Sequence, residues 1–120
     1  MTNTTIATVV DGYIAMWNET DATRRREIAG DVFTEDAGYL DPLMAGEGHD
    51  GIATMIAAAQ EQFPGHRFEL TQGPDTHHDR VRFAWRLVGD AGPVAAGVDF
   101  GVVADDGRLQ AVTGFLEPAA

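Results

Sequence analysis

The side chains that could do chemistry in this chain belong to few residue types. Its 120 residues include no cysteine, serine or lysine. A thiol nucleophile, a serine–histidine triad, a Schiff-base lysine and a phosphate-binding loop with its lysine are therefore excluded. Acid–base work must come from Asp, Glu, His, Tyr, Arg or Thr. The formal net charge of −11 is expected to repel phosphate backbones, so nucleic acid is not an expected partner, whereas a neutral or cationic small molecule is compatible with it.

Asp41 is an acid whose position favours a functional role. In the stretch AGYLDPLMAG, residues 37–46, Tyr39 and Asp41 fall on one face of a short predicted strand, and Pro42 ends that strand. The carboxylate then lies at the mouth of a pocket, or it simply starts a turn. The residues alone leave both interpretations open.

Asp99 lies in the middle of an apolar strand, where a carboxylate is costly unless it has a partner. Its face of the strand carries only small residues, Ala95, Gly97 and Gly101. This leaves room above the carboxylate, and an apolar setting would raise its pKa. A structural hydrogen bond to the backbone, or to Arg82 or Arg86 on the preceding strand, is the alternative.

Helices and strands that would position these acids follow from hydrophobic periodicity. Apolar residues at helical spacing predict helices over 6–17, 22–33 and 51–63. Alternating patterns predict strands over 37–41, 66–72, 80–88, 93–104 and 108–117, with a loop between 42 and 50 and a bulge at Gly73–Pro74. The order α-α-β-α-β-β-β-β predicts an α+β fold. We expect one domain spanning residues 1–120, with three helices on a curved antiparallel sheet and an apolar pocket between them.

Four motifs in this order resemble a known superfamily. They are YIAMWNETD (13–21), DAGYLDP (36–42), GHDGIATMI (48–56) and DFGVVADDGRLQAVTGF (99–115). The chain is similar to the SnoaL-like branch of the nuclear transport factor 2-like superfamily, whose fold is the cystatin-like α+β cone. Among the enzymes of that superfamily, the ketosteroid isomerases look nearest. Their functional tyrosine and two aspartates match Tyr13, Asp41 and Asp99.

The resemblance implies a cofactor-independent proton transfer next to a carbonyl, of the isomerase or polyketide-cyclase type. Asp41 would be the ionised base, and Tyr13 and Asp99 would donate to the developing oxyanion. Asp99 donates only while protonated. Ketosteroid isomerase is itself the reference case of an aspartic acid kept neutral in this way. A protonated Asp99 is therefore an expectation that the resemblance implies. The alternatives are a core tyrosine at position 13 and a non-catalytic ligand-binding or dimerisation domain.

An apolar pocket of this kind would bind a small apolar or aromatic ligand of steroid or polyketide size. The side chains expected to line it are Phe63, Phe68, Phe83, Trp85, Val112 and Leu116, with His49 at its mouth. No cofactor and no metal are predicted. His77 and His78 are adjacent and would point to opposite faces of a strand, so they could not hold one metal together.

The remaining expectations concern partners and location. The resemblance implies a homodimer, because members of the superfamily often dimerise through the exposed face of the sheet. Here the arginine-bearing face of residues 80–88 and the last two strands would form that face. No apolar run approaches the ~20 residues that a membrane span needs, so no membrane contact is expected. The N-terminal stretch MTNTTIATVV lacks the basic region of a signal peptide, which favours a cytoplasmic protein.

Overall fold

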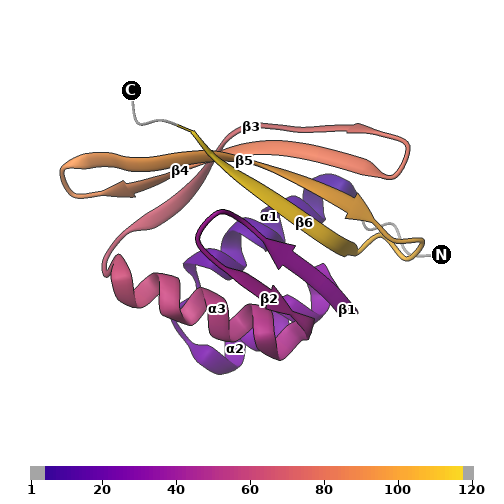
Figure 1. The fold of residues 1–120 in the computed structure, drawn as a ribbon, viewed down its shortest axis with the longest axis horizontal. Coiled ribbons are helices and arrows are strands. Elements are labelled where there is room, and N and C mark those ends of the chain that lie inside the picture. Colours follow the sequence, from indigo (N-terminus) through magenta and orange to yellow (C-terminus); the bar gives the residue numbers. More distant parts are fainter. Residues whose placement is uncertain (1–4, 118–120) are drawn as a thin grey trace.

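Three helices lie against one face of a single bent sheet in the computed structural model, which describes residues 5–117 (Figure 1). The helices are α1 (Ile6–Asn18), α2 (Ala22–Val32) and α3 (Gly48–Gln62). The strands are β1 (Phe33–Leu40), β2 (Ala45–Glu47), β3 (Arg67–His77), β4 (Arg80–Gly89), β5 (Gly92–Val103) and β6 (Leu109–Glu117). The predicted α+β class, with the helices on one side of the sheet, is confirmed.

The sheet is mixed rather than purely antiparallel. Its strand order is β2-β1-β6-β5-β4-β3, and β1 runs parallel to β6 while every other pair is antiparallel. The prediction of an antiparallel sheet was wrong at this one pair. The two strands are separated by most of the chain, so no local pattern fixes their relative direction.

Strand β2 is the second correction, since it lies where a loop was expected. Leu40 pairs with Ala45 and Gly38 with Glu47, so the chain folds back on β1 through a tight turn at Pro42. Three paired residues are too few to give an alternating pattern. The turn brings the residues after Asp41 back over the end of β1.

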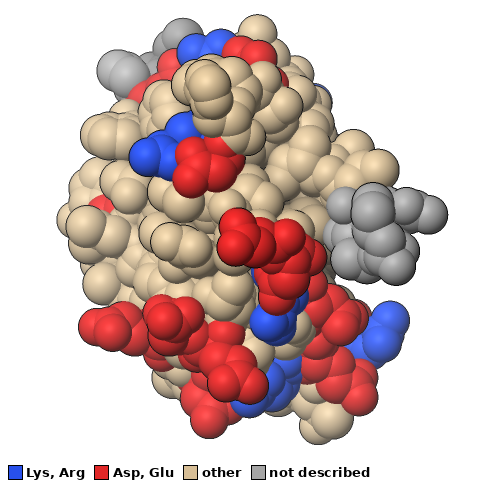
Figure 2. Space-filling model, turned by 90° about the vertical axis from the view of Figure 1, so that its right-hand side faces the viewer, with Lys and Arg blue, Asp and Glu red and all other residues tan. Residues whose placement is uncertain are grey.

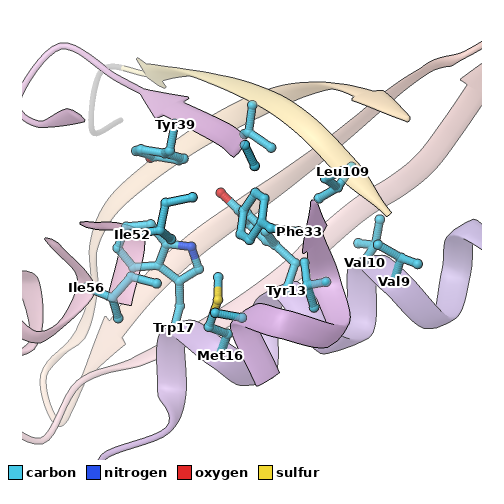
Figure 3. Packing of buried hydrophobic residues seen from close by; sticks show 14 of the residues in the cluster. Val9, Val10, Tyr13, Met16, Trp17, Phe33, Tyr39, Ile52, Ile56 and Leu109 are labelled. Carbon is cyan, nitrogen blue, oxygen red and sulfur yellow. The ribbon is translucent and has the colours of Figure 1, made fainter. Parts of the chain in front are cut away.

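Helix α1 supplies much of the core. Thr5 caps it, because its hydroxyl accepts a hydrogen bond from the Thr8 amide at 3.2 Å. Its buried stripe consists of Val9, Val10, Tyr13, Met16 and Trp17. Figure 3 shows these side chains directed toward the sheet, where Phe33, Tyr39 and Leu109 meet them.

The curvature of the sheet has a local cause in β3. The pairing of β3 with β4 shifts on both sides of Gln72, as the predicted bulge at Gly73–Pro74 requires. Gly73 has φ of +95°, and a Cβ there would lie 2.8 Å from the Arg82 carbonyl oxygen. Bulges bend a strand and increase its twist, so the sheet curls around the helices.

Acidic side chains gather on part of one face of the molecule (Figure 2). In Figure 2, Asp and Glu gather on that face and far outnumber the basic groups beside them, in keeping with the net charge of −11. None of the helices within residues 5–117 combines the length and apolar character required to cross a membrane.

Candidate active site

Asp99 is buried at the middle of the sheet, with 2% of its surface exposed. The Tyr13 hydroxyl donates a hydrogen bond to Asp99 Oδ2 at 2.5 Å, and the Trp85 indole N–H donates to Oδ1 at 3.0 Å. Arg82 and Arg86 are not its partners. They pair with carboxylates of β3 on the opposite face of the sheet. The buried acid is thus held by a helix residue and a strand residue.

A glycine explains how Trp85 reaches this carboxylate. Trp85 on β4 lies opposite Gly97 on β5, two residues before Asp99 on the same face. A Cβ on Gly97 would lie 2.5 Å from the indole ring. The space that the sequence predicted above this strand is therefore filled in part by the ring, which lies across Gly97 and directs its N–H toward Asp99.

Burial changes the protonation of both members of the Tyr13–Asp99 pair. Loss of solvent raises the pKa of Asp99 to about 6, although the hydrogen bonds from Tyr13 and Trp85 oppose this and the charge of Asp41 adds to it. Burial, and then the charge of Asp99, raise the pKa of Tyr13 well above its usual range, and the same two causes raise that of Tyr39. Both tyrosines therefore keep their protons and remain hydrogen-bond donors.

Asp41 combines the two roles that the sequence left open. Its Oδ1 accepts hydrogen bonds from the backbone amides of Leu43 and Met44, at 2.8 and 2.9 Å, which makes it the first residue of a turn. Its Oδ2 accepts a hydrogen bond from the Tyr39 hydroxyl at 2.6 Å. The carboxylate is half-buried and also lines an apolar cavity between the sheet and the helices. Asp41 is thus a turn residue whose side chain is fixed at the edge of a pocket.

Gly114 on β6 marks the point where the two acids come together. It pairs with Asp99 on β5. A Cβ on Gly114 would meet Asp99 Oδ1 at 2.8 Å, Asp41 Cβ at 3.2 Å and the Tyr39 hydroxyl at 3.3 Å. All three groups thus surround one point that only a glycine leaves free. The two acids come from β5 and from the turn after β1. Each accepts a hydrogen bond from a tyrosine, on α1 for Asp99 and on β1 for Asp41.

The cavity between sheet and helices has a volume of about 110 Å³ and an almost wholly apolar wall. Tyr13, Asp41 and Asp99 all contribute to its lining. Since a cavity of about 150 Å³ holds benzene, this smaller one encloses a carbonyl group and a few carbons. The ligand of steroid or polyketide size expected from the sequence would extend beyond it.

Four of the side chains predicted to line the pocket do so, namely Phe63, Phe68, Trp85 and Leu116. Phe83 and Val112 instead belong to the buried core, where the Phe83 ring packs edge-on against Tyr13. His49 is also elsewhere: its Nε2 lies 2.8 Å from the Phe33 carbonyl oxygen at the junction of α2 and β1.

Several lining residues were not predicted, and one of them carries a sequence signal. Trp17, Tyr39 and Met44 all line the cavity. Tyr39 shares a strand face with Asp41, so its position two residues earlier could have identified it as a partner. No cluster of three or more His, Asp or Glu side chains suited to a metal ion occurs in the part of the chain that the structure describes.

Comparison with known proteins agrees with this fold. The SnoaL-like domain family matches residues 10–112, and the chain belongs to that family. A crystal structure from Agrobacterium tumefaciens strain C58, described as a "putative isomerase" of the SnoaL-like family, is 46% identical. It covers 93% of this chain and 97% of its own, with a TM-score of 0.88.

More distant structures share the fold alone. A "putative polyketide cyclase" from Sinorhizobium meliloti is 17% identical over 88% of this chain and 92% of its own, with a TM-score of 0.69. A cystatin-like protein of unknown function from Methylobium petroleophilum PM1 is 20% identical over 96% of this chain and 78% of its own, with a TM-score of 0.75. No curated protein matches the chain.

Proposed function

We propose that this chain is a cofactor-independent enzyme that moves a proton next to a carbonyl group of a small, mostly apolar substrate. The observation that carries this proposal is the convergence of Asp41 and Asp99 around Gly114, at the wall of one apolar cavity. The likeness to a SnoaL-like protein described as a "putative isomerase" supports an isomerase over a cyclase.

Asp41 acts as the base in this proposal. Its carboxylate is fixed by three hydrogen bonds, from Leu43, Met44 and Tyr39, and it needs no rearrangement to face the cavity. It takes the proton from the carbon next to the substrate carbonyl, and electrons shift onto the carbonyl oxygen to give an enolate. Asp41 then returns the proton to a carbon of the same conjugated system, so no cofactor or redox partner is consumed.

Tyr13 and Asp99 together stabilise the enolate oxygen. While Asp99 is ionised, the Tyr13 hydroxyl proton is directed at Oδ2. When Asp99 carries a proton on Oδ2, that proton can be donated to the Tyr13 oxygen, and the tyrosine proton becomes free to point at the substrate. A donor already in place in a dry site stabilises a developing oxyanion strongly.

The first experiment compares wild type with Asp41→Asn and with Asp90→Asn, which removes an exposed acid from the β4–β5 turn. Each protein is given a panel of β,γ-unsaturated ketones, including a Δ5-3-ketosteroid, and formation of the conjugated product is followed by absorbance. We expect turnover by wild type and Asp90→Asn, and a loss of roughly 10²–10⁴-fold in Asp41→Asn. Equal turnover in all three proteins would remove Asp41 from the mechanism. Ligand binding without turnover in any of them would favour a non-catalytic binding domain.

We also propose that the chain forms a homodimer through the outer face of its sheet. Phe100 on β5 and Phe115 on β6 are 45% and 54% exposed on the face opposite the helices, and their rings pack edge-on with centroids 5.8 Å apart. Exposed apolar patches rimmed by polar residues are typical of protein interfaces. The ion pairs of Arg82 with Asp75 and Arg86 with Glu69 provide such a rim.

A further inference from the structure

The small volume of the cavity raises the question of where the rest of a larger substrate would lie. About 110 Å³ of space adjoins Asp41 and Asp99, which is enough for a carbonyl group and a few carbons. Typical sites for drug-sized ligands have about 300–1,000 Å³. A substrate larger than one ring must therefore leave the cavity through its mouth.

A second hollow lies next to the cavity, along α3. This groove has a volume of about 430 Å³ and lies between the turn after Asp41 and one stripe of the helix. Three residues, Leu43, Met44 and Ala59, line both the cavity and the groove. The two spaces therefore adjoin one another at these three residues.

The chemistry of the groove selects an uncharged, apolar occupant. Its helix side carries Gly51, Thr54, Met55, Ala58 and Gln62, and its other side carries Leu43, Met44 and Ala45. None of these lining residues is charged, although the chain has 8 basic and 19 acidic side chains. Leu43 is 74% exposed beside this groove, so its apolar side chain is available to contact such an occupant.

We propose that the substrate is an amphiphile with a small enolisable carbonyl head and a flexible aliphatic tail. The head enters the cavity beside Asp41, and the tail lies in the groove between Leu43–Ala45 and α3. A rigid polycyclic substrate fits this shape less well, because the path from the cavity past Leu43 and Met44 suits a chain that can bend. This assignment rests on the proposed proton transfer for the identity of the head group.

Tail binding can be tested separately from catalysis. The chain has two tryptophans, Trp17 and Trp85, and both line the cavity, so their fluorescence reports on occupation of the head site. The probes are straight-chain methyl ketones of increasing length, from butan-2-one to decan-2-one. The variants are Ala58→Glu, which places a charge in the groove, and Ala15→Glu, which adds the same charge at an exposed position of α1.

In wild type and Ala15→Glu, each added methylene that reaches the groove should lower Kd roughly threefold. In Ala58→Glu, butan-2-one should bind as it does to wild type. The factor by which octan-2-one binds more tightly than butan-2-one should be at least about tenfold smaller than in wild type. A wild-type Kd that is independent of chain length, or identical series for the two variants, would overturn the inference. Chain-length dependence of Kd, in a protein that does not accelerate exchange of the hydrogens next to the ketone carbonyl in D₂O, would uphold the groove assignment and contradict the proposed function instead.

Discussion

The Tyr13 hydroxyl lies 2.5 Å from Asp99 Oδ2, and both residues are at most 2% exposed. This contact joins the middle of α1 to the middle of β5, across 86 positions of sequence. It also fixes the chemistry of the site, because it opposes the increase in the pKa of Asp99 that burial causes. The remaining oxygen of Asp99 is bound by Trp85. The buried acid is therefore balanced between its two protonation states near pH 6.

Removing the Tyr13 hydroxyl should have two linked effects. In Tyr13→Phe, loss of the oxyanion donor should lower turnover by roughly 10²–10³-fold. The pKa of Asp99 should rise further, because a hydrogen bond that favours the ionised form is gone. Carbon-detected NMR titration of the carboxyl group measures the second effect. Tyr39→Phe, which removes the donor to Asp41, is the control and should leave the Asp99 titration near its wild-type midpoint. An unchanged Asp99 pKa in Tyr13→Phe would contradict the contact as described.

Asp99 should also make folding stability depend on pH. Its pKa is about 6 in the folded protein and is 3.8 for an unperturbed aspartate, so the folded state binds this proton more tightly than the unfolded state does. The contribution of this proton to the free energy of unfolding is complete below about pH 4. It is lost as the pH rises through about 6. The difference between the two pKa values corresponds to roughly 3 kcal/mol.

Urea denaturation of wild type and Asp99→Asn at several pH values isolates this effect. Other titrating groups are common to both proteins, so their contributions cancel in the difference between the two unfolding free energies. Relative to Asp99→Asn, wild type should lose up to about 3 kcal/mol of unfolding free energy between pH 4 and pH 7. A difference that is independent of pH would show that Asp99 does not titrate in this range.

Gly114 should be intolerant of any side chain. In Gly114→Ala the new methyl group would lie 2.8 Å from Asp99 Oδ1 and 3.2 Å from Asp41 Cβ. We expect a loss of about 1–3 kcal/mol in unfolding free energy, together with reduced turnover because the two acids are pushed apart. Gly38→Ala in β1 is the matched control, since a Cβ there meets nothing within 4 Å. Equal stability of the two variants would argue against close convergence at Gly114.

The proposed dimer has a direct test on the outer face of the sheet. Phe115→Glu places a charge beside Phe100 in the exposed aromatic patch and should convert a dimer to a monomer in light scattering at micromolar concentration. Leu43→Glu changes another exposed apolar residue, at the cavity mouth, and should leave the mass unchanged. A wild-type monomer at that concentration would end the dimer proposal.

Sequence patterns predicted the helices, the long strands and the side chains that face the core, because these depend on local periodicity. The expectation that Tyr13, Asp41 and Asp99 act together came from the family resemblance and not from these patterns. The parallel pairing of β1 with β6 was not predictable in this way, since it joins distant segments. The bond from Trp85 to Asp99 depends on strand register and on the space over Gly97, neither of which a single strand pattern contains.

His49 illustrates the opposite error. Its place at the start of α3 suggested the mouth of the pocket, but its ring lies against the Phe33 carbonyl oxygen. That carbonyl also accepts a hydrogen bond from Arg108 at 3.1 Å. The histidine thus links the start of α3 to the junction between α2 and β1. Such a role depends on which backbone oxygen lies within reach, and only the folded structure shows this.

The proposed mechanism depends most directly on the removal of a proton from carbon by Asp41. Exchange of the hydrogens next to the carbonyl of a methyl ketone in D₂O, followed by NMR, reports that step without requiring isomerisation. Wild type and Asp90→Asn should accelerate the exchange alike, and Asp41→Asn should lower the enzymatic rate by roughly 10²–10⁴-fold while keeping ketone affinity. Exchange by Asp41→Asn at the wild-type rate would contradict the account.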